Sequence, residues 1–442
     1  MKYKVSKYVR IVNTDNYIYA YSFLAGNLLV IYNEYERSIF EAVLQGEDVE
    51  PCSFTDQLYQ GYFVFKQDEN EEELVEFLYH NNTHRSNDLT VILILSELCN
   101  FRCTYCYEEY DKHIMSDEIK DGTLSFIAKY VADNGIKQVT ISWFGGEPSL
   151  FKEKVIGFMQ ELRHRLPADI MLSGFMTTNA FLLDRKSFEE YYEVGINGFQ
   201  ITVDGFSHTH NQLRPSIDGK ETWQTIINNL HSISESWKAD SFVLLRVNYN
   251  SAVYAELIEF FEYIKDTFQN KFTIHAHPIS KLGELEKDSI CDPVTIELAG
   301  TRIGEYFANN DTKTDFAQLR ANLFGGVCYA AKHNSFLVDA HGCIRKCTVD
   351  LHNEENYVGQ IHGTNDFSID IRSLAKWVES QSHFPECESC MIYPVCMGRS
   401  CPLATLKKTS NCKTNKAAIY AFLDSLAERY YQKTIGYNPA YD

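Results

Sequence analysis

The chain has 442 residues, of which 45% are hydrophobic and 23% charged, and its formal net charge is −19. A chain of this length exceeds one ordinary core, so we expect two or three domains. The acidic balance argues against a nucleic-acid partner, because a phosphate-binding protein needs a basic face. No apolar run reaches the about 18 residues that span a bilayer, and the N-terminus has no signal-peptide core. We therefore expect a cytoplasmic protein without a membrane partner.

The thirteen cysteines are distributed unevenly. In an intracellular protein, such a number indicates metal or redox chemistry more than disulfides. Three cysteines lie between Cys99 and Cys106, and eight lie between Cys328 and Cys412. Cys52 and Cys291 stand alone, and we expect them to be small apolar residues of the interior.

The first 88 residues are predicted to form a unit of short strands followed by helices. The strands are expected at 9–12, 17–21 and 28–32, and the helices at 34–45 and 69–80. This order resembles a shortened winged-helix peptide-recognition element of enzymes that modify ribosomally made peptides. The resemblance implies that a leader peptide adds a strand to an exposed sheet edge. The alternative is that the unit only covers one end of the next domain.

From residue 89 the predicted strands and helices alternate. The strands are expected at 89–95, 138–144, 170–177, 198–203, 242–248 and 271–277, with amphipathic helices near 116–133, 151–165, 184–194, 221–236 and 253–268. This alternation predicts an α/β fold, a partial (β/α)6 TIM-type barrel over residues 89–310, with its chemistry at the carboxyl ends of the strands. A doubly wound open sheet is the alternative, but no G-x-G-x-x-G sequence follows the first strand.

Directly after the first strand comes the sequence Cys99-Asn-Phe-Arg-Cys103-Thr-Tyr-Cys106. Three thiolates can hold three irons of a cubane cluster and leave the fourth iron without a protein ligand. The spacing resembles that of the radical S-adenosyl-L-methionine (SAM) superfamily. The resemblance implies that SAM binds the open iron, that an electron breaks its sulfonium C–S bond, and that the 5′-deoxyadenosyl radical takes a hydrogen atom from the substrate. A structural zinc site is the alternative, but zinc prefers paired cysteines and a closed tetrahedron.

Residues near the next strand ends extend this resemblance. Gly145, Gly146 and Glu147 match the GGE motif of the family, which is implied to hold the amino group of SAM. Tyr105, the aromatic residue before the last cysteine, is expected in the same cofactor site. Asn179 follows the third strand and is expected near the ribose, or else as a turn residue.

A further motif follows the fourth strand: Asp204-Gly, and then His210-x3-Arg214-Pro. It resembles the peptide-modifying branch of the superfamily. An arginine fork fits a carboxylate at two points, so Arg214 is a candidate to hold the methionine carboxylate of SAM or the substrate. Arg246 and Asn248 alternate along the fifth strand and are candidates for the same pocket.

The cysteines near the C-terminus form a second pattern, which closely resembles the SPASM domain. The matching positions are Cys328, Cys347, Cys387, Cys390, Cys396, Cys401 and Cys412, with one extra residue between the fifth and the sixth. We expect this domain over 311–442, ending in a helix near 415–431. The resemblance implies two auxiliary [4Fe–4S] clusters, and hence three clusters in all. A zinc ribbon is the alternative.

The resemblance also distributes these ligands between the two auxiliary clusters. Auxiliary cluster I would use Cys328, Cys347 and Cys401, and the remaining four cysteines would fully ligate auxiliary cluster II. One iron of cluster I is then left to account for. Either Cys343 is its fourth ligand, or the site is open and binds a substrate thiolate.

These features predict a radical SAM oxidoreductase that installs a crosslink, such as a thioether, in a ribosomally made precursor peptide. Its electron donor would be of the flavodoxin or ferredoxin type. Formylglycine generation, as in anaerobic sulfatase maturases, is opposed by Asn334 and Thr348, since the resemblance to that group would place a cysteine and an acid at these positions. Peptide epimerisation is also compatible with the motifs. A small-molecule dehydrogenase would have no use for the N-terminal unit, and a non-enzymatic peptide-binding or electron-carrying protein would need no SAM pocket.

Overall fold

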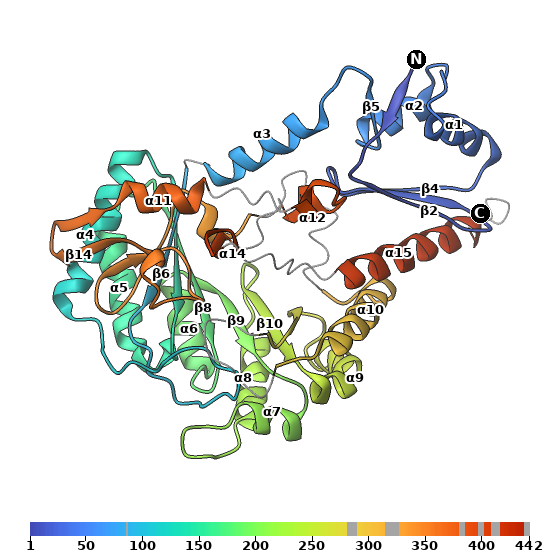
Figure 1. The fold of residues 1–442 in the computed structure, drawn as a ribbon. Helices are drawn as coiled ribbons and strands as arrows, with labels where there is room; N and C mark the ends of the chain where they lie inside the picture. The colour runs from blue at the N-terminus through green and yellow to red at the C-terminus, as the bar shows by residue number, and fades with distance from the viewer. Residues whose placement is uncertain are drawn as a thin grey trace.

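The computed structural model describes residues 1–84, 87–280, 290–313, 327–379, 385–396, 402–407 and 416–436 (Figure 1). Its centre is a ten-stranded sheet in the order β11-β10-β9-β8-β7-β6-β12-β13-β14-β15. Among the described helices, none is long and apolar enough to cross a bilayer.

Six neighbouring strands of this sheet are parallel, as the sequence predicted. They are β6 (Asp88–Ile94), β7 (Gln138–Phe144), β8 (Met171–Thr178), β9 (Ile196–Thr202), β10 (Phe242–Tyr249) and β11 (Thr273–Pro278). The helices that connect them are α4 (Asp117–Asn134), α5 (Lys152–Arg165), α6 (Arg185–Glu193), α7 (Ser207–Leu213), α8 (Trp223–Glu235) and α9 (Ser251–Thr267), and a 3-10 turn, η1 (Pro148–Phe151), precedes α5. In the described chain, β11 and β6 do not pair, so the barrel is open and the predicted α/β fold class is confirmed.

Residues along these strands alternate between two environments, because successive side chains of a strand point to opposite faces. In β6, Val91 and Leu93 are completely buried in the main hydrophobic core, whereas Thr90 and Ile92 border an internal cavity. In β7, Trp143 is likewise buried in the core. Apolar burial on one face therefore holds the sheet, and the other face is left for a site.

The C-terminal segment continues the same sheet, which the sequence pattern did not predict. Strand β12 (Ser335–Val338) pairs in parallel with β6, and β13 (Cys343–Arg345), β14 (Tyr357–Gly363) and β15 (Asp366–Ile369) follow as an antiparallel meander. The cysteine-bearing hairpin is thus hydrogen-bonded to the strand that leads into Cys99.

The first 84 residues form two small sheets and three helices; in Figure 1 the sheets, α1 and α2 lie at the upper right, and α3 runs from them along the top toward the left. Strands β2 (Val9–Asn13), β3 (Ile18–Ser22) and β4 (Asn27–Ile31) are antiparallel, and β1 (Tyr3–Val5) pairs with β5 (Val64–Lys66). The helices are α1 (Glu34–Leu44), α2 (Ser53–Gln60) and α3 (Glu71–Thr83). The sequence missed β1, α2 and β5, and placed the other elements to within a few residues.

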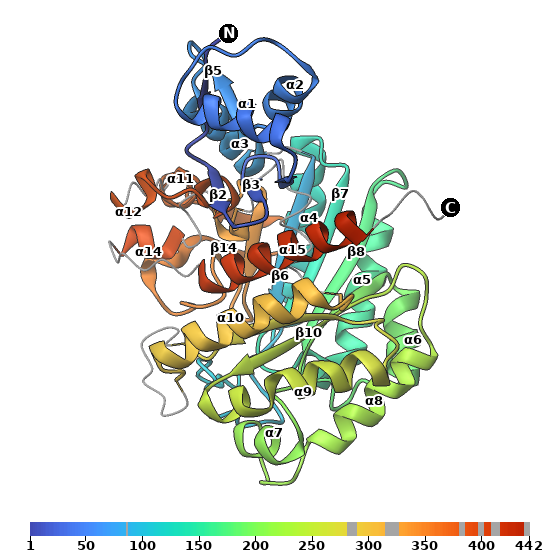
Figure 2. The ribbon, with the colours of Figure 1, turned by 90° about the vertical axis from the view of Figure 1, so that its right-hand side faces the viewer.

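This unit packs against the end of the chain. Helices α10 (Pro293–Asn309) and α15 (Lys416–Gly436) lie side by side below the β2–β4 sheet (Figures 1 and 2). All five residues of β3 are buried, because one face of the strand packs on α1 and α2 and the other face joins the main core. Arg10 pairs with Asp424 of α15 at 2.8 Å, and the buried Tyr19 hydroxyl donates to the same carboxylate.

The helix α3 is attached in a similar way. The hydroxyl of Tyr79 donates to the carbonyl of Val378 at 3.0 Å, at the end of α11 (Ile371–Val378). The ring of Tyr8 stacks on that of Tyr393 in α13 (Tyr393–Cys396), and α12 (Pro385–Glu388) and α14 (Pro402–Leu406) are its neighbours in sequence. The first unit is therefore fastened mainly to the C-terminal third of the chain.

Replacing Asp424 by alanine should loosen the β2–β4 sheet from α15, since Arg10 loses its ion pair and Tyr19 loses an acceptor. Asp424 is about half exposed, so we expect only about 1 kcal/mol, equivalent to a roughly fivefold faster amide hydrogen exchange in β2–β4. Asp133→Ala, which removes an exposed pair with Lys129, is the matched control. Equal exchange in both variants would contradict this role of Asp424.

Candidate active site

A cavity of about 640 Å³ lies on the inner side of the parallel strands and reaches their carboxyl ends. Every one of the six strands contributes to its wall: Thr90 and Ile92, Ser142 and Phe144, Phe175 and Thr177, Gln200 and Thr202, Arg246 and Asn248, and His277. The volume is that of a typical small-molecule or cofactor site. The edge of the sheet where the sequence predicted chemistry is therefore hollow.

The three cysteines after β6 border this cavity together. Cys99, Cys103 and Cys106 are free thiols in the loop that follows β6. Burial raises the pKa of Cys99 to about 12 and that of Cys103 to about 11. Buried thiols with raised pKa values are poor nucleophiles, and a bound metal is what turns such thiols into thiolates.

These residues fit an iron–sulfur cluster better than a single metal ion. In the described part of the chain, no three His, Cys, Asp or Glu side chains converge as the ligands of one ion do. A cubane takes one cysteine on each of three irons, so its three sulfurs need not converge on one point. The three cysteines that share the cavity wall would hold such a cluster.

The backbone of the cysteine loop is fixed by the segment that follows α7. The amide of Arg102 donates to the carbonyl of Pro215, and that of Thr104 to the carbonyl of Leu213, both at 2.9 Å. Phe101 forms a further bridge with Ser216. The His-x3-Arg-Pro motif of the sequence therefore ends in the segment that supports the cysteines.

Side chains of the same motifs meet in a buried network around Tyr105. Its hydroxyl donates to Asp204 and accepts from Arg214 at 2.6 Å and from the amide of Asn248 at 3.1 Å. Burial raises the pKa of Asp204, whose other carboxylate oxygen accepts from the backbone N–H of Asn248 at 2.8 Å. Both carboxylate oxygens of Asp204 are thus engaged by the protein, so Asp204 acts as a brace between β9 and β10.

Arg214 is held by this network but is not saturated by it. Its guanidinium is 3.9 Å from Asp204, and its buried Nε atom has no hydrogen-bond partner among the described residues. Although burial opposes the charge, Cys103, Tyr105 and Asp204 hold the pKa of Arg214 well above its ordinary value. A buried cation with a donor to spare beside the cysteines suits a carboxylate ligand.

The Gly-Gly-Glu sequence makes a tight turn next to the cysteine loop. Gly145 and Gly146 have φ angles of +81° and +47°, and a Cβ atom on Gly146 would collide with the carbonyl of Leu98. Glu147 donates its backbone N–H to that same carbonyl at 2.9 Å. Only glycine allows the two loops to approach so closely.

The side chain of Glu147 turns toward β8. Its carboxylate accepts from the hydroxyl of Thr178 at 2.6 Å and from the backbone N–H groups of Asn179 and Ser149 at 2.7 and 3.0 Å. Asn179 in turn donates to Asn100 at 2.8 Å. Glu147 and Asn179 both border the cavity, but most of the hydrogen bonds that they form stabilise the turns around them. Their roles toward SAM stay predictions.

One buried carboxylate near the cysteines was missed. Glu108, two residues beyond Cys106, borders the cavity and accepts a hydrogen bond from the backbone N–H of Gly146. Burial raises its pKa to about 7. The only sequence signal was an acidic residue directly after the cysteine motif, which a surface loop shows equally often.

The second group of cysteines lies partly beside the first. Tyr329 follows Cys328 and borders the cavity. Its hydroxyl shares a 2.8 Å hydrogen bond with the hydroxyl of Thr348, the residue after Cys347. Burial raises the pKa of Tyr329, and the neighbouring Cys347 and Cys328 contribute. The segments before β12 and after β13 thus bring Tyr329 and Thr348, the chain neighbours of these two cysteines, to the cavity wall.

The remaining cysteines are placed in part. Cys387 and Cys396 lie beside Tyr393, whose pKa is raised to about 12 by burial and by these neighbours, and the N–H of Cys390 donates to the Cys387 carbonyl. Cys401 and Cys412 lie outside the described residues. The predicted pairing of ligands into two auxiliary clusters therefore stays a prediction.

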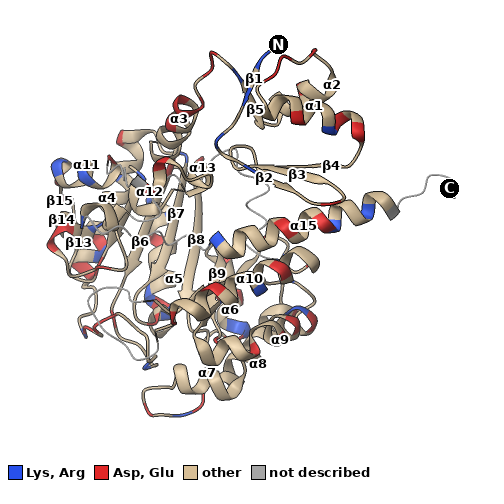
Figure 3. Ribbon diagram, turned by 45° about the vertical axis from the view of Figure 1, so that its right-hand side comes forward, with Lys and Arg blue, Asp and Glu red and all other residues tan. Residues whose placement is uncertain are grey.

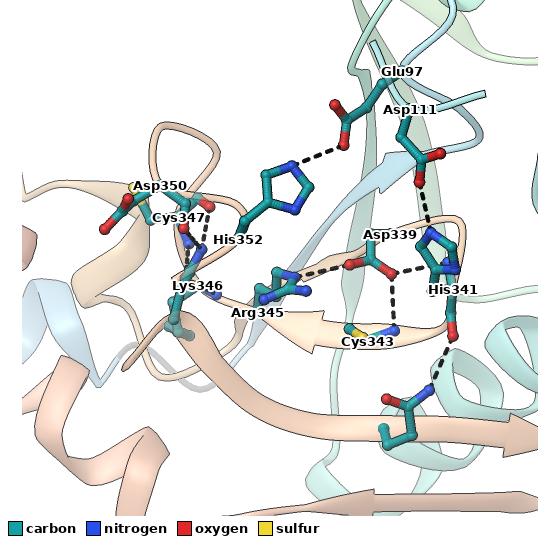
Figure 4. Close-up of polar contacts among 12 residues, drawn as sticks. Glu97, Asp111, Asp339, His341, Cys343, Arg345, Lys346, Cys347, Asp350 and His352 are labelled. Carbon is teal, nitrogen blue, oxygen red and sulfur yellow. Dashed lines mark hydrogen bonds and ion pairs between the residues drawn. The ribbon is translucent and has the colours of Figure 1, made fainter. Parts of the chain in front are cut away.

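Cys343 and Cys347 lie at different ends of the hairpin (Figure 4). The backbone N–H of Cys343 donates to Asp339, which also pairs with Arg345 at 2.8 Å. The N–H of Cys347 instead donates to Asn356. Whether Cys343 is the fourth ligand of cluster I or that site is open stays a prediction.

Figure 4 also shows how the hairpin and the segment after it contact the chain on either side of the three cysteines. His341 pairs with Asp111 at 2.7 Å, and His352 lies 3.4 Å from Glu97. The ring of His113 stacks on that of His341 with 4.1 Å between centroids. These contacts join the two cysteine-bearing regions a second time, besides the β6–β12 pairing.

Comparison with known proteins agrees with this geometry. Residues 93–278 match the Radical SAM superfamily. The chain carries a radical SAM domain. That domain holds the three cysteines, the Gly-Gly-Glu turn and the network around Tyr105.

The similarity to curated relatives extends beyond this domain. The chain is 23% identical over 384 residues to a serine-type anaerobic sulfatase-maturating enzyme of Bacteroides thetaiotaomicron, covering 76% of this chain and 86% of that one. It is 25% identical over 316 residues to a GTP 3',8-cyclase of Staphylococcus aureus, and this match covers 64% of this chain and 86% of that enzyme. It spans about half, 49%, of the corresponding enzyme of Staphylococcus carnosus.

Solved structures share the fold of this chain. The enzyme anSMEcpe with bound AdoMet superposes with a TM-score of 0.61 at 15% identity, over 79% of this chain and 96% of that one. Streptococcus suis SuiB bound to precursor peptide SuiA gives a TM-score of 0.50 at 16% identity, over 90% and 94%. At these identities the likeness concerns the fold alone.

The buried His210 should make the stability of the protein depend on pH. Its Nδ1 atom accepts from the N–H of Asp204 at 3.1 Å, and burial lowers the pKa of His210 well below 6.5. The unfolded chain therefore binds a proton below pH 6.5 that the folded chain does not, so stability is lost as the pH falls. From this group we expect about 1.4 kcal/mol per pH unit.

The measurement compares urea unfolding of the wild type and His210→Gln under anaerobic conditions at pH 7, 6 and 5. The free-energy difference between the two should shrink as the pH falls, because the variant has no histidine to protonate here. His208→Gln on the exposed side of the same helix is the control. A difference that stays constant with pH would rule out this account of His210.

Proposed function

We propose that this chain is a radical SAM maturase that modifies a ribosomally made peptide and installs a crosslink, thioether or other. The observation that carries the proposal is one cavity bordered by the three cysteines after β6 and by Tyr329 and Thr348, the neighbours of Cys328 and Cys347. The first cysteine group and the chain neighbours of two cysteines of the second group therefore border one space. The similarity to a sulfatase-maturating enzyme and to the fold of SuiB supports a peptide substrate.

The residues of the chain would share the work as follows. Cys99, Cys103 and Cys106 would hold a [4Fe–4S] cluster, which with SAM supplies the radical that removes a hydrogen atom. Arg214, with an unpaired buried Nε, would hold the carboxylate of SAM. The buried network around Tyr105 keeps this arginine and the cysteine loop in register, and the surrounding sheet excludes water.

The carboxy-terminal cysteines would hold two auxiliary clusters, three clusters in all. Cys328 and Cys347 would belong to auxiliary cluster I, and Cys387, Cys390 and Cys396 to auxiliary cluster II, together with Cys401 and Cys412. Lys346 supports the first pair, because its buried ammonium group donates to the carbonyls of Lys332 and Ser335 and so ties the two strands together.

Formylglycine generation is the second candidate, because the first of the relatives above is a sulfatase-maturating enzyme. Two positions speak against it. Thr348 stands where the resemblance to that group would place an acid, and its hydroxyl is bonded to Tyr329 at 2.8 Å. Asn334 stands where the same resemblance would place a cysteine, and its side chain accepts from Tyr130 at 2.7 Å. A crosslinking reaction needs neither residue type.

The leader of the precursor would bind the first unit. Among the described residues, β4 has a neighbouring strand on one side only, and a groove of about 470 Å³ separates it from α2. Leu28 and Leu29 border this groove on the strand side, and Asp56 and Gln60 border it on the helix side. An added strand would gain backbone hydrogen bonds along β4 and apolar contacts in the groove.

Replacing Cys99, Cys103 and Cys106 together by alanine should abolish reductive formation of 5′-deoxyadenosine. The iron content of the anaerobically reconstituted protein should fall by about a third, from about 12 Fe per chain. Cys52→Ala is the control, since this cysteine lies far from the cluster ligands in sequence and caps α2. SAM cleavage that persists in the triple variant would refute the proposed function.

Two lysines in the groove should weaken leader binding at least tenfold. They would change the charge and the shape of the helix side of the groove, against which a leader strand would lie. The change is Asp56→Lys with Gln60→Lys, and both residues are exposed. The probe is the precursor peptide encoded beside the gene, measured by fluorescence anisotropy. Asp68→Lys, exposed but outside the groove, is the control, and equal affinity in both would leave the first unit as a cover only.

The product distinguishes the candidate reactions. After incubation of that peptide with the reduced enzyme and SAM, mass spectrometry should show the loss of a pair of hydrogen atoms together with the loss of one alkylatable thiol. An unchanged mass would point to epimerisation, and a carbonyl-reactive product would point to formylglycine.

A further inference from the structure

The six parallel strands contain a single lysine or arginine, which is Arg246 of β10. Figure 3 shows how the other charged residues gather on outer helices and loops, whereas strands such as β7 and β8 carry none. Arg246 borders the cavity together with Gln200 and Thr202 of the adjacent strand. A cation inside a barrel wall has lost most of its water, which is costly unless a ligand or partner compensates it.

The guanidinium of Arg246 is positioned but not neutralised. Its Nε atom donates to the side-chain oxygen of Asn248 at 2.8 Å, which fixes the plane of the fork. Its two terminal nitrogens form no hydrogen bond or ion pair with any described residue, and they are not sealed from solvent. Burial lowers the pKa of Arg246, as expected of a cation without a paired carboxylate.

The carboxylates of the cavity wall are occupied elsewhere. Glu147 accepts from three groups near the start of α5 and the end of β8, and Glu108 accepts from Gly146. Asp204 lies behind the wall and acts on Arg246 only through its charge, because its two oxygens are bonded to Tyr105 and to the backbone of Asn248. The Arg246 fork is therefore left to an anion that enters the cavity.

Arg246 lies deeper in the sheet than the groups that face the cysteines. It precedes Asn248, the residue that bonds to Tyr105, by two positions, so its Cα is about 6–7 Å further from the carboxyl end of β10. In the sheet it pairs with Thr202 on one side and with His275 on the other. The cysteine loop reaches β10 through the bond between Tyr105 and Asn248, and Arg246 lies one inward-facing position below that contact. An anion at Arg246 would therefore sit below the cysteine loop, deeper in the barrel.

We propose that Arg246 is a specificity-determining residue that binds the carboxylate of an acidic side chain of the substrate, next to the position that is modified. This inference rests on the proposed function. A planar guanidinium with both terminal nitrogens open matches a carboxylate at two points, which lysine does not. The methionine carboxylate of SAM is the other source of the same chemistry, and Arg214 beside Cys103 serves that carboxylate.

The test uses full-length reconstituted protein saturated with S-adenosylhomocysteine. The probes are N-acetylglutamate N-methylamide and its glutamine counterpart, which differ only in the carboxylate, and their binding is followed by ligand-observed NMR. The wild type should bind the glutamate probe about tenfold more tightly than the glutamine probe. Arg246→Gln should bind both equally, Arg246→Lys should keep part of the preference, and the exposed Arg302→Gln should behave as the wild type.

A second arm separates the two sources of the carboxylate. The affinities for S-adenosylhomocysteine and for 5′-methylthioadenosine, which lacks the amino acid, should keep the same ratio in Arg246→Gln as in the wild type. A ratio that falls in this variant would assign Arg246 to SAM and overturn the proposal. A wild type that does not distinguish glutamate from glutamine would also overturn it, even if Arg246→Gln fails to fold. Absence of 5′-deoxyadenosine formation by the wild type is a different result, which would refute the function and not this inference.

Discussion

The conformation of one short loop, from Cys99 to Cys106, is the constraint on which the rest of the site depends. The loop alone cannot hold three thiols side by side in the interior. Its eight residues make too few apolar contacts with one another to offset the conformational entropy lost when the loop is ordered. Neighbouring segments supply the missing order. The backbone after α7 accepts from the amides of Arg102 and Thr104, and the turn at Gly146 presses against Leu98. Each of these partners comes from a different crossover connection, so the loop is correct only when the parallel sheet is complete.

The same dependence explains why the buried network around Tyr105 contains a carboxylate and an arginine and not apolar residues. Apolar side chains of equal volume would stabilise the interior at least as well. A hydrogen-bonded set instead fixes direction, because Tyr105, Asp204 and Arg214 can satisfy one another in few arrangements. Placing Tyr105 inside the cysteine motif ties the orientation of the cysteines to β9 and β10. The geometry of the cysteine loop is thereby coupled to strands whose other residues line the cavity.

Local patterns in the sequence were enough to predict the six parallel strands, because each is an apolar run bounded by turn residues and followed by an amphipathic helix. They could not predict the β12–β6 pairing, since the register of two strands more than 200 residues apart is set by the whole fold. Helix α7 was missed because its polar residues lack a clear apolar face. Helix α10 carried usable signals, the Asp292 cap and Pro293 at its first turn, which were not used. The glycines and cysteines of the cavity were found because their chemistry is rare, whereas Glu108 and Tyr329 belong to residue types that are common at surfaces.

The first unit is packed against the C-terminal segment of the chain. Its sheet packs on α15 through Tyr19 and Arg10, and Tyr8 stacks on Tyr393 beside Cys387 and Cys396. The groove at β4 and the cysteine-rich segment are therefore packed together and not joined by a linker alone. In the proposed function, a peptide held at β4 would reach the cavity over the surface of the C-terminal segment, so that path would limit the distance between its leader and its modified residue. If Cys387 and Cys396 hold a cluster as proposed, loss of that cluster would loosen the contact between Tyr8 and Tyr393 and would weaken peptide binding at a groove that itself holds no metal.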